Sequence, residues 1–166
     1  MRLLLSIPLA ILATSAVADL DVVFRDGAPK DQFTFTASDN CLSGPVEIVL
    51  DLSGSDAGLI FDVSSEGLGV EVFQPLELVD GRTLVAETSE VADGDTQLML
   101  MLESLPAGQP VSFTIDLDDT IGAREIIVSD NEIAGASVSV KSADMIAKAS
   151  FLDGPRLTVP LPDCLS

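Results

Sequence analysis

The stretch that decides the fold is Val111-Ser112-Phe113-Thr114-Ile115-Asp116-Leu117-Asp118, in which apolar and polar residues alternate without a break. Side chains of a β-strand point alternately to opposite faces, so the four apolar residues share one face and the polar residues share the other. This pattern predicts a strand that covers a hydrophobic core with one face and meets water with the other.

The same kind of run recurs along the chain. Strands are expected over residues 20–25, 32–36, 46–52, 70–73, 98–102, 125–128, 136–141 and 156–159. Turn-forming pairs such as Asp26-Gly27, Asp80-Gly81 and Asp153-Gly154 separate them at short intervals. Residues 145–152 fit either a helix or a strand. The sequence therefore predicts an all-β protein, an antiparallel two-sheet β-sandwich, with a barrel-like closure as the alternative.

Three residues outside the clearest strands have expected structural roles. Phe61 and Phe73 lie in short apolar segments and are expected to pack into the core. Gly135 lies in a turn before Ala136, where a residue without a Cβ gives the backbone the conformational freedom that a tight turn needs.

The N-terminus has the organisation of a secretory signal peptide. Arg2 precedes an apolar stretch over residues 3–13, and Ala16-Val17-Ala18 forms a small-residue cleavage site. The apolar stretch is shorter than the ~20 residues of a membrane-spanning helix. We therefore expect a signal peptide over residues 1–18, cleaved after Ala18, and a single domain over residues 19–166. The mature protein is expected to be secreted or periplasmic, without membrane insertion.

The two cysteines suit an oxidising compartment. A disulfide between Cys41 and Cys164 is expected there, and it would close a long loop. Such a loop is worth on the order of 4–5 kcal/mol in the chain-entropy account. Two separate buried thiols are the alternative.

Composition excludes several functional classes. With Lys+Arg 8 against Asp+Glu 27, the formal net charge is −19, which disfavours nucleic acids and anionic membrane surfaces as partners. The chain contains no His, Trp or Tyr, so it lacks the base of a serine triad and the usual aromatic platforms for sugars. We therefore expect a protein that is not an enzyme. The acid excess by itself fits a surface that stays soluble at high ionic strength.

Closely spaced aspartates form the one candidate metal site. Asp116, Asp118 and Asp119 end an expected strand, and Ca²⁺ is bound by clusters of such carboxylate oxygens. Glu125 or Asp130 could add a ligand from a neighbouring strand. A second Asp-rich turn occurs at residues 93–95. Solvated turn residues are the simpler explanation for any one of these acids.

Several blocks of this sequence resemble a known family. They are the passage from the signal peptide into Ala-Asp-Leu, residues 27–31, 48–62, 67–79 and 113–120, Arg124-Glu125-Ile126, and residues 132–136. Together they are similar to the small secreted "aggregation factor core" proteins of marine and related alphaproteobacteria. That family is labelled by analogy with the factors that mediate sponge cell adhesion through Ca²⁺-dependent self-association and glycan contacts. The resemblance therefore implies extracellular, non-enzymatic adhesion, and it supplies no set of functional residues.

The function expected from the sequence is thus association at the cell surface by a secreted, non-catalytic β-domain. Its partner would be a protein or a glycan, including a second copy of the chain, with Ca²⁺ as a candidate cofactor. The alternative is a periplasmic module that binds a small ligand or supports another envelope protein.

Overall fold

The computed structural model describes residues 18–65, 73–121, 128–129, 131–143 and 145–161. One set of strands is β1 (Ala18–Arg25), β2 (Asp31–Ala37), β5 (Glu77–Asp80), β8 (Pro110–Ile115) and β12 (Arg156–Leu161). A second set is β3 (Val46–Asp51), β6 (Val85–Thr88), β7 (Gln97–Leu102), β10 (Ser137–Ser142) and β11 (Met145–Ser150). Two short strands, β4 (Ile60–Phe61) and β9 (Leu117–Asp118), and the 3-10 turn η1 (Arg82–Leu84) complete the described elements.

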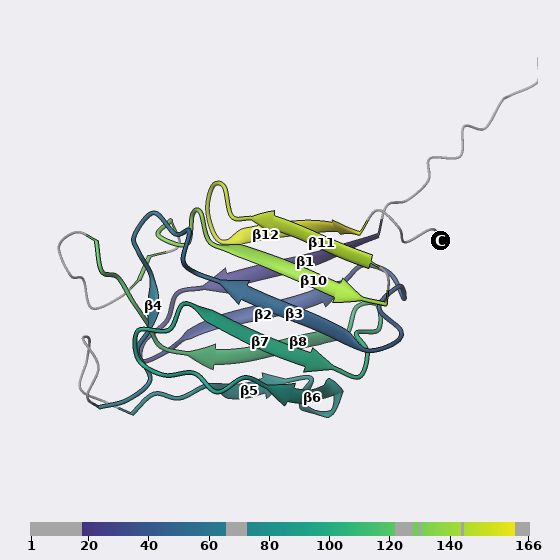
Figure 1. Ribbon diagram of the computed structural model, residues 1–166, viewed down its shortest axis with the longest axis horizontal. Coiled ribbons are helices and arrows are strands. Elements are labelled where there is room, and N and C mark those ends of the chain that lie inside the picture. Colours follow the sequence, from purple (N-terminus) through teal and green to yellow (C-terminus); the bar gives the residue numbers. More distant parts are fainter. Residues whose placement is uncertain (1–17, 66–72, 122–127, 130, 144, 162–166) are drawn as a thin grey trace, which may run out of the picture.

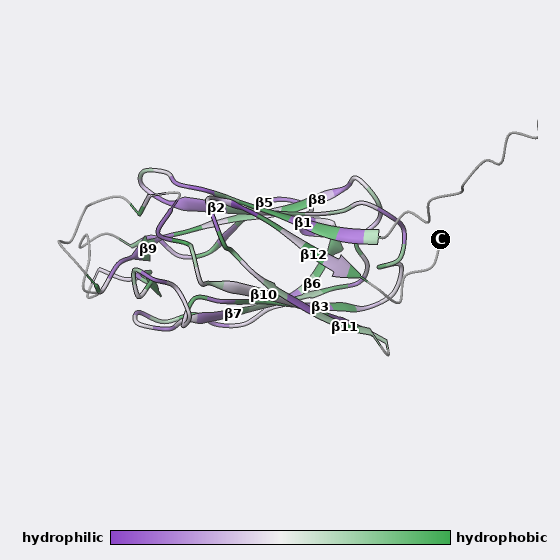
Figure 2. Ribbon diagram, turned by 90° about the horizontal axis from the view of Figure 1, so that it is seen from above, coloured by the Kyte–Doolittle hydropathy of each residue, from purple (hydrophilic) through white to green (hydrophobic). Residues whose placement is uncertain are grey.

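These strands form two antiparallel sheets that pack face to face (Figure 1). The first sheet has the order β12-β1-β2-β8-β5, and the second has the order β11-β10-β3-β7-β6. Seen from above, the sheets are two separate layers, with β9 beyond one end (Figure 2). Because no pairing among the described strands joins the two layers into a closed ring, the predicted two-sheet sandwich is confirmed and the barrel is not.

The core lies between the layers and is built by the alternation that the sequence shows. Along β2, every second residue from Asp31 to Ala37 is buried. Phe33 stacks on Phe113 of the neighbouring strand with ring centroids 5.4 Å apart, and Phe24 lies 5.1 Å from Phe33. Aliphatic side chains of the second sheet, among them Ile48, face them across the layer and are also buried. Burial of these large apolar side chains is the main source of stability.

The chain crosses between the sheets at both lateral edges. On one side η1 connects β5, an edge strand of the first sheet, to β6, an edge strand of the second. On the other side β11 leads into β12, again from one edge strand to another. Residues 145–152, which fitted a helix or a strand, therefore contain the edge strand β11.

Edge strands β5 and β6 were not expected from the sequence. Their side chains are mostly exposed on both faces, so neither segment shows an apolar alternation. Each also has a register shift against its single neighbour, at Leu78/Asp80 and at Val85/Glu87. Such irregular pairing is a common way of protecting a sheet edge. The strands expected at 70–73 and 125–128 lie outside the described residues, apart from Phe73 and Val128.

Gly135 has the unusual backbone geometry that its turn suggests. Its φ angle is +88°, in the region that favours glycine. A Cβ at this position would lie 2.1 Å from the carbonyl oxygen of Gly54, so the two glycine backbones approach too closely for any side chain. The expected backbone role of Gly135 is confirmed.

The predicted signal peptide lies outside the described residues except for Ala18. Ala18 is the first residue of β1 and pairs with Leu161 of β12. Cleavage after Ala18 stays a prediction, and it would leave β1 to begin at Asp19. In the part of the chain that the structure describes, no helix is both long enough and apolar enough to cross a bilayer.

Candidate functional site at the acidic end of the sandwich

The strand expected over residues 111–118 divides at Asp116. Residues 110–115 form β8 within the first sheet, whereas Leu117 and Asp118 form β9 and pair with Phe61 and Ile60 of β4. The backbone N–H of Asp62 donates to the carbonyl of Asp116 at 3.1 Å, which continues this pairing by one residue. Asp62 and Asp116 therefore lie opposite each other beyond the end of the first sheet.

Asp31, in the first sheet, holds in place the point where β8 ends and β9 begins. It begins β2, pairs with Ile115 of β8 and is only 2% exposed. Its Oδ1 accepts the N–H of Gly27 at 3.1 Å, and its Oδ2 accepts the N–H of Leu117 at 3.2 Å. Through these two hydrogen bonds, the Asp31 carboxyl group joins the loop between β1 and β2 to β9.

Burial raises the pKa of the Asp31 carboxyl to about 7, although the N–H donors of Gly27 and Leu117 act in the opposite direction. The negative charges of Asp116 and Asp26 add to the increase. For Asp116, burial likewise raises the pKa to about 7, and the charges of Asp62 and Asp118 contribute further. Both carboxyl groups therefore hold a proton at mildly acidic pH, where an ordinary aspartate is ionised.

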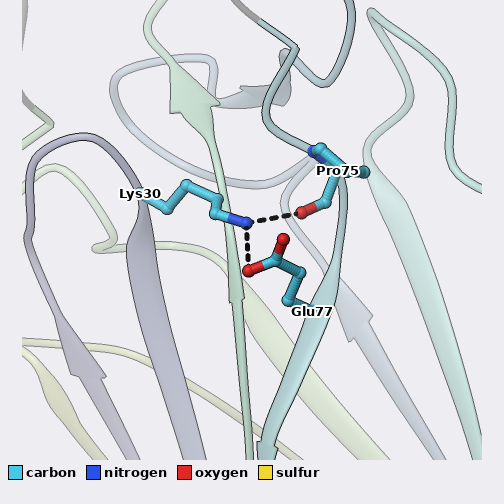
Figure 3. Close-up of polar contacts among 3 residues, drawn as sticks. All are labelled: Lys30, Pro75 and Glu77. Carbon is cyan, nitrogen blue, oxygen red and sulfur yellow. Dashed lines mark hydrogen bonds and ion pairs between the residues drawn. The ribbon is translucent and has the colours of Figure 1, made fainter.

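Lys30 lies beside this group but is held by other partners. Its ammonium group is 2.9 Å from a carboxylate oxygen of Glu77 and donates to the carbonyl of Pro75 at 3.0 Å (Figure 3). The Lys30 side chain is mostly buried, whereas Glu77 is exposed. The lysine charge still lowers the pKa of Asp116, but it is the last of the contributions to that value. Lys30 therefore fastens the segment before β5 to the first sheet.

The structure places the predicted calcium ligands at this end. Asp118 and Asp119 are buried, and Asp118 Oδ1 accepts the backbone N–H of Asp119 at 3.0 Å. Asp116 interacts with Asp62 as well as with Asp118. Within the described ranges, no three acidic or sulfur-bearing side chains are arranged to hold a metal ion. Calcium binding by Asp116, Asp118 and Asp119 stays a prediction, and the suggested additional ligands Glu125 and Asp130 lie outside the described residues.

Sequence reasoning missed Asp31 and Asp62 as members of the group. A signal for Asp31 was present, because Asp31 has the same strand parity as Phe33 and Phe35 and must therefore face inward with them. Asp62 follows the two-residue strand β4, which is too short to show any periodicity.

The second Asp-rich turn has a structural role. Asp93 Oδ1 accepts the N–H groups of Val63 and Ser64 at 2.7 and 2.8 Å, and its Oδ2 accepts the Ser64 hydroxyl. The Ser64 hydroxyl is the main reason that the pKa of Asp93 is lowered. Asp95 in turn accepts the N–H of Ala92. The Asp93 carboxylate therefore fixes the segment that follows β4, and the Asp95 carboxylate closes its own turn.

Phe73 corrects one expectation. Phe61 is fully buried as predicted, but Phe73 is 71% exposed. Phe73 precedes Gln74, whose N–H donates to the Val63 carbonyl next to β4. Phe73 itself thus lies outside both sheets, among the loops at the sandwich end, so its side chain has no core to enter. Ile121, which follows β9, is similarly exposed at 63%.

A pocket of about 430 Å³ lies away from the acidic group, where β5 crosses to the second sheet. Its lining includes Asp80, Arg82, Thr83, Gln109 and Pro110. None of the five buried or half-buried aspartates at the sandwich end contributes to it. The side chains that line this pocket offer one cation (Arg82), one anion (Asp80) and several hydrogen-bonding groups to a small molecule.

The predicted disulfide has one end in the described structure. Cys41 is half-buried and precedes Leu42, which forms an isolated bridge with Leu105. Cys164 lies outside the described residues, so the Cys41–Cys164 pairing stays a prediction.

Comparison with protein-family models, curated proteins and solved structures gives no match for this chain. The resemblance to the aggregation factor core proteins therefore stays an expectation.

Proposed function

We propose that this protein is a non-catalytic β-sandwich that associates with a protein or glycan at the cell surface, including a second copy of itself. The observation that carries the proposal is the exposure of Phe73 on the loops beside β4. The chain has seven phenylalanines, and six of them are buried in the core. A large aromatic side chain left in water is a typical anchor of a binding surface.

The position of Phe73 supports this assignment. Sandwich domains commonly bind partners with the loops gathered at one end, where the rigid sheets hold them. Phe73 and Ile121 extend from the two segments that adjoin the β4–β9 ribbon. Figure 1 shows β4 at one end of the sandwich, so these two segments lie at that end.

Calcium has a physical role in this proposal. With a formal net charge of −19, two copies of the chain repel each other, as do the chain and an acidic surface glycan. Divalent cations reduce that repulsion more effectively than Na⁺ at equal concentration. Association is therefore expected to be stronger in CaCl₂ than in EDTA.

The test measures binding of the fluorescently labelled exported protein to intact cells of the source strain, with millimolar CaCl₂ or EDTA and at matched ionic strength. Phe73→Ala is expected to weaken binding at least tenfold. The matched control is Ile146→Ala, which removes an equally exposed apolar side chain from β11. Equal binding by Phe73→Ala and the unmodified protein contradicts the proposed surface, and no binding in any condition contradicts the proposed function.

The pocket beside η1 supports a second candidate function, the capture of a small anionic ligand in the periplasm. Arg82 supplies the positive charge, while Thr83 and Gln109 supply hydrogen-bonding groups. Thermal stabilisation by small carboxylates that is abolished in Arg82→Ala, but kept in Phe73→Ala, would favour this function. The reverse pattern favours surface association.

A further inference from the structure

Each sheet of the sandwich has two edge strands, and each edge strand has one side on which no described strand pairs with it. Figure 1 shows β5 and β6 along one lateral edge of the molecule and β11 and β12 along the other. Proteins usually obstruct such edges with bulges, proline or charged side chains, because an open edge accepts a further strand. The four edge strands of this protein are obstructed to different degrees.

Three of the four edge strands are obstructed. β5 and β6 have the register shifts described above, so neither presents a regular row of main-chain groups. In β12 the obstruction is Pro160. The N–H of Phe24 donates to the carbonyl of Pro155, so by the alternation of an antiparallel ladder residues 156, 158 and 160 direct their main-chain groups away from β1. Pro160 therefore removes an N–H donor from the free side of β12.

β11 has neither kind of obstruction. Its residues, Met145–Ser150, pair with β10 in an unbroken register and include no proline. The N–H of Phe151, directly after β11, donates to the carbonyl of Ala136, directly before β10. By the same alternation, every second residue of β11 directs its N–H and C=O groups away from β10. These residues are Ile146, Lys148 and Ser150, and all three are exposed.

The charge of this edge selects the kind of strand that it can accept. The chain has a formal net charge of −19, but β10, β11 and β12 contain no acidic residue. Lys148 is the central outward-facing residue of β11, and among the described residues it forms no direct ion pair. Its charge acts on Asp51, but that residue lies on β3, two strands away. A partner strand that places a carboxylate opposite Lys148 gains a cross-strand pair, whereas a basic strand meets repulsion.

A second copy of the chain fits this edge less well. Pairing of β11 with itself would bring two copies of Lys148 close together on one face, and like charges at such positions are unfavourable. The other described edge strands of a second copy are the obstructed ones. With a formal net charge of −19 on each molecule, two copies also repel each other at long range.

We propose that the free edge of β11 binds an extended acidic segment of another protein, which joins the second sheet as its sixth strand. Hydrogen bonds with the main chain of Ile146, Lys148 and Ser150 hold the segment, as in other cases of strand addition. A carboxylate directly opposite Lys148 fixes its register. The site contains none of the loop residues on which the proposed function rests, so either proposal can fail without the other.

The first experiment titrates the full exported chain, labelled with nitrogen-15, with a blocked synthetic hexapeptide in which valine and glutamate alternate. We expect the amide signals of Ile146, Lys148 and Ser150 to shift, and their hydrogen exchange with water to slow by about tenfold or more at saturation. The amides of Ala147 and Ala149 already face β10 and should change little. Unchanged exchange at the three outward-facing amides overturns the proposal.

Two further peptides separate strand addition from simple attraction of charge. A hexapeptide with lysine in place of glutamate should bind about tenfold more weakly, because like charges then face Lys148. The valine–glutamate peptide methylated on the main-chain nitrogens of its glutamates keeps its charge but loses the donors that face β11, so it should not slow the exchange. Equal binding of the methylated and unmethylated peptides means that charge alone attracts the peptide, which overturns the proposal.

The Lys148→Glu substitution reverses the charge of the edge. It should weaken binding of the valine–glutamate peptide about tenfold and strengthen binding of the valine–lysine peptide. Arg25→Glu is the matched control, because it makes the same change of charge at an exposed residue of β1, in the other sheet. Phe73→Ala should bind the peptide as the unmodified protein does. Equal weakening by Lys148→Glu and Arg25→Glu contradicts a site at β11.

Sedimentation of the unmodified protein without peptide, together with hydrogen exchange, tests a second copy as the occupant. We expect no dimer in which exchange at Ile146, Lys148 and Ser150 is slowed. Such a dimer would assign the β11 edge to a second copy and overturn the proposal.

Discussion

The inner face of β2 carries phenylalanines and one aspartate. Both residue types follow the same alternation along the strand, but their burial changes the free energy of folding in opposite directions. Phe33 and Phe35 point into the core, where burial of each ring stabilises the fold. Asp31 points inward with the same parity, but burial of its carboxyl group costs free energy. Two amide donors offset part of that cost, and the raised pKa of Asp31 reflects the part that remains. The comparison shows that strand parity places a side chain but does not decide whether its burial is favourable.

The largest expected change in stability concerns the phenylalanines on the inner face of β2. Phe33→Ala removes a ring that contacts both Phe24 and Phe113. It should lower the free energy of unfolding by about 3–5 kcal/mol, measured from urea unfolding curves. Phe73→Ala is the control and should change stability by no more than about 0.5 kcal/mol, because Phe73 is on the surface. Equal effects of the two substitutions would contradict the described core.

A smaller change in stability is expected for Asp31, the aspartate on the inner face of β2. Asp31→Ala leaves the N–H groups of Gly27 and Leu117 without their acceptor, which should cost about 1–3 kcal/mol at pH 5. At pH 8 the cost should be smaller, because the unmodified protein then carries the unfavourable buried charge. Urea unfolding curves of the unmodified protein and of Asp31→Ala at pH 5 and pH 8 measure this cost. A larger cost at pH 8 than at pH 5 would mean that the folded-state pKa of Asp31 lies below its unfolded-state value.

The smallest expected change in stability concerns the ion pair between Lys30 and Glu77, which lies beside the acidic group. Glu77→Gln removes the exposed partner of Lys30, and it should lower stability by at most about 1 kcal/mol because water screens such pairs. The Lys30 bond to the Pro75 carbonyl remains in this variant. Glu90→Gln, on an exposed loop position, serves as the control. A loss of several kcal/mol would show that Glu77 does more than pair with Lys30.

Much of the sheet architecture could be predicted, because strands with one buried face have a visible period of two. This holds for the segments that became β1, β2, β3, β8, β10 and β12, whereas β7 was expected from an unbroken apolar run. It fails for β5 and β6, whose exposed edges show no such period. At the candidate site, Asp116 and Asp118 were identified because they are close in sequence, whereas Asp31 reaches them across 86 positions through its contact with Leu117. No local pattern reports a contact over that distance.

By itself, the sequence determined that this chain folds into antiparallel strands with one buried face, because alternation and turn residues are local properties of a chain; the choice of an open sandwich over a barrel came from the structure. It also determined that the molecule is strongly acidic and has no histidine. Only the tertiary structure decided that the strand at 110–118 divides at Asp116, that Phe73 stays in water, and that Asp31 is buried among other acids. Each of these depends on which distant segment lies nearby, and pairing between distant segments is set by the packing of the whole fold.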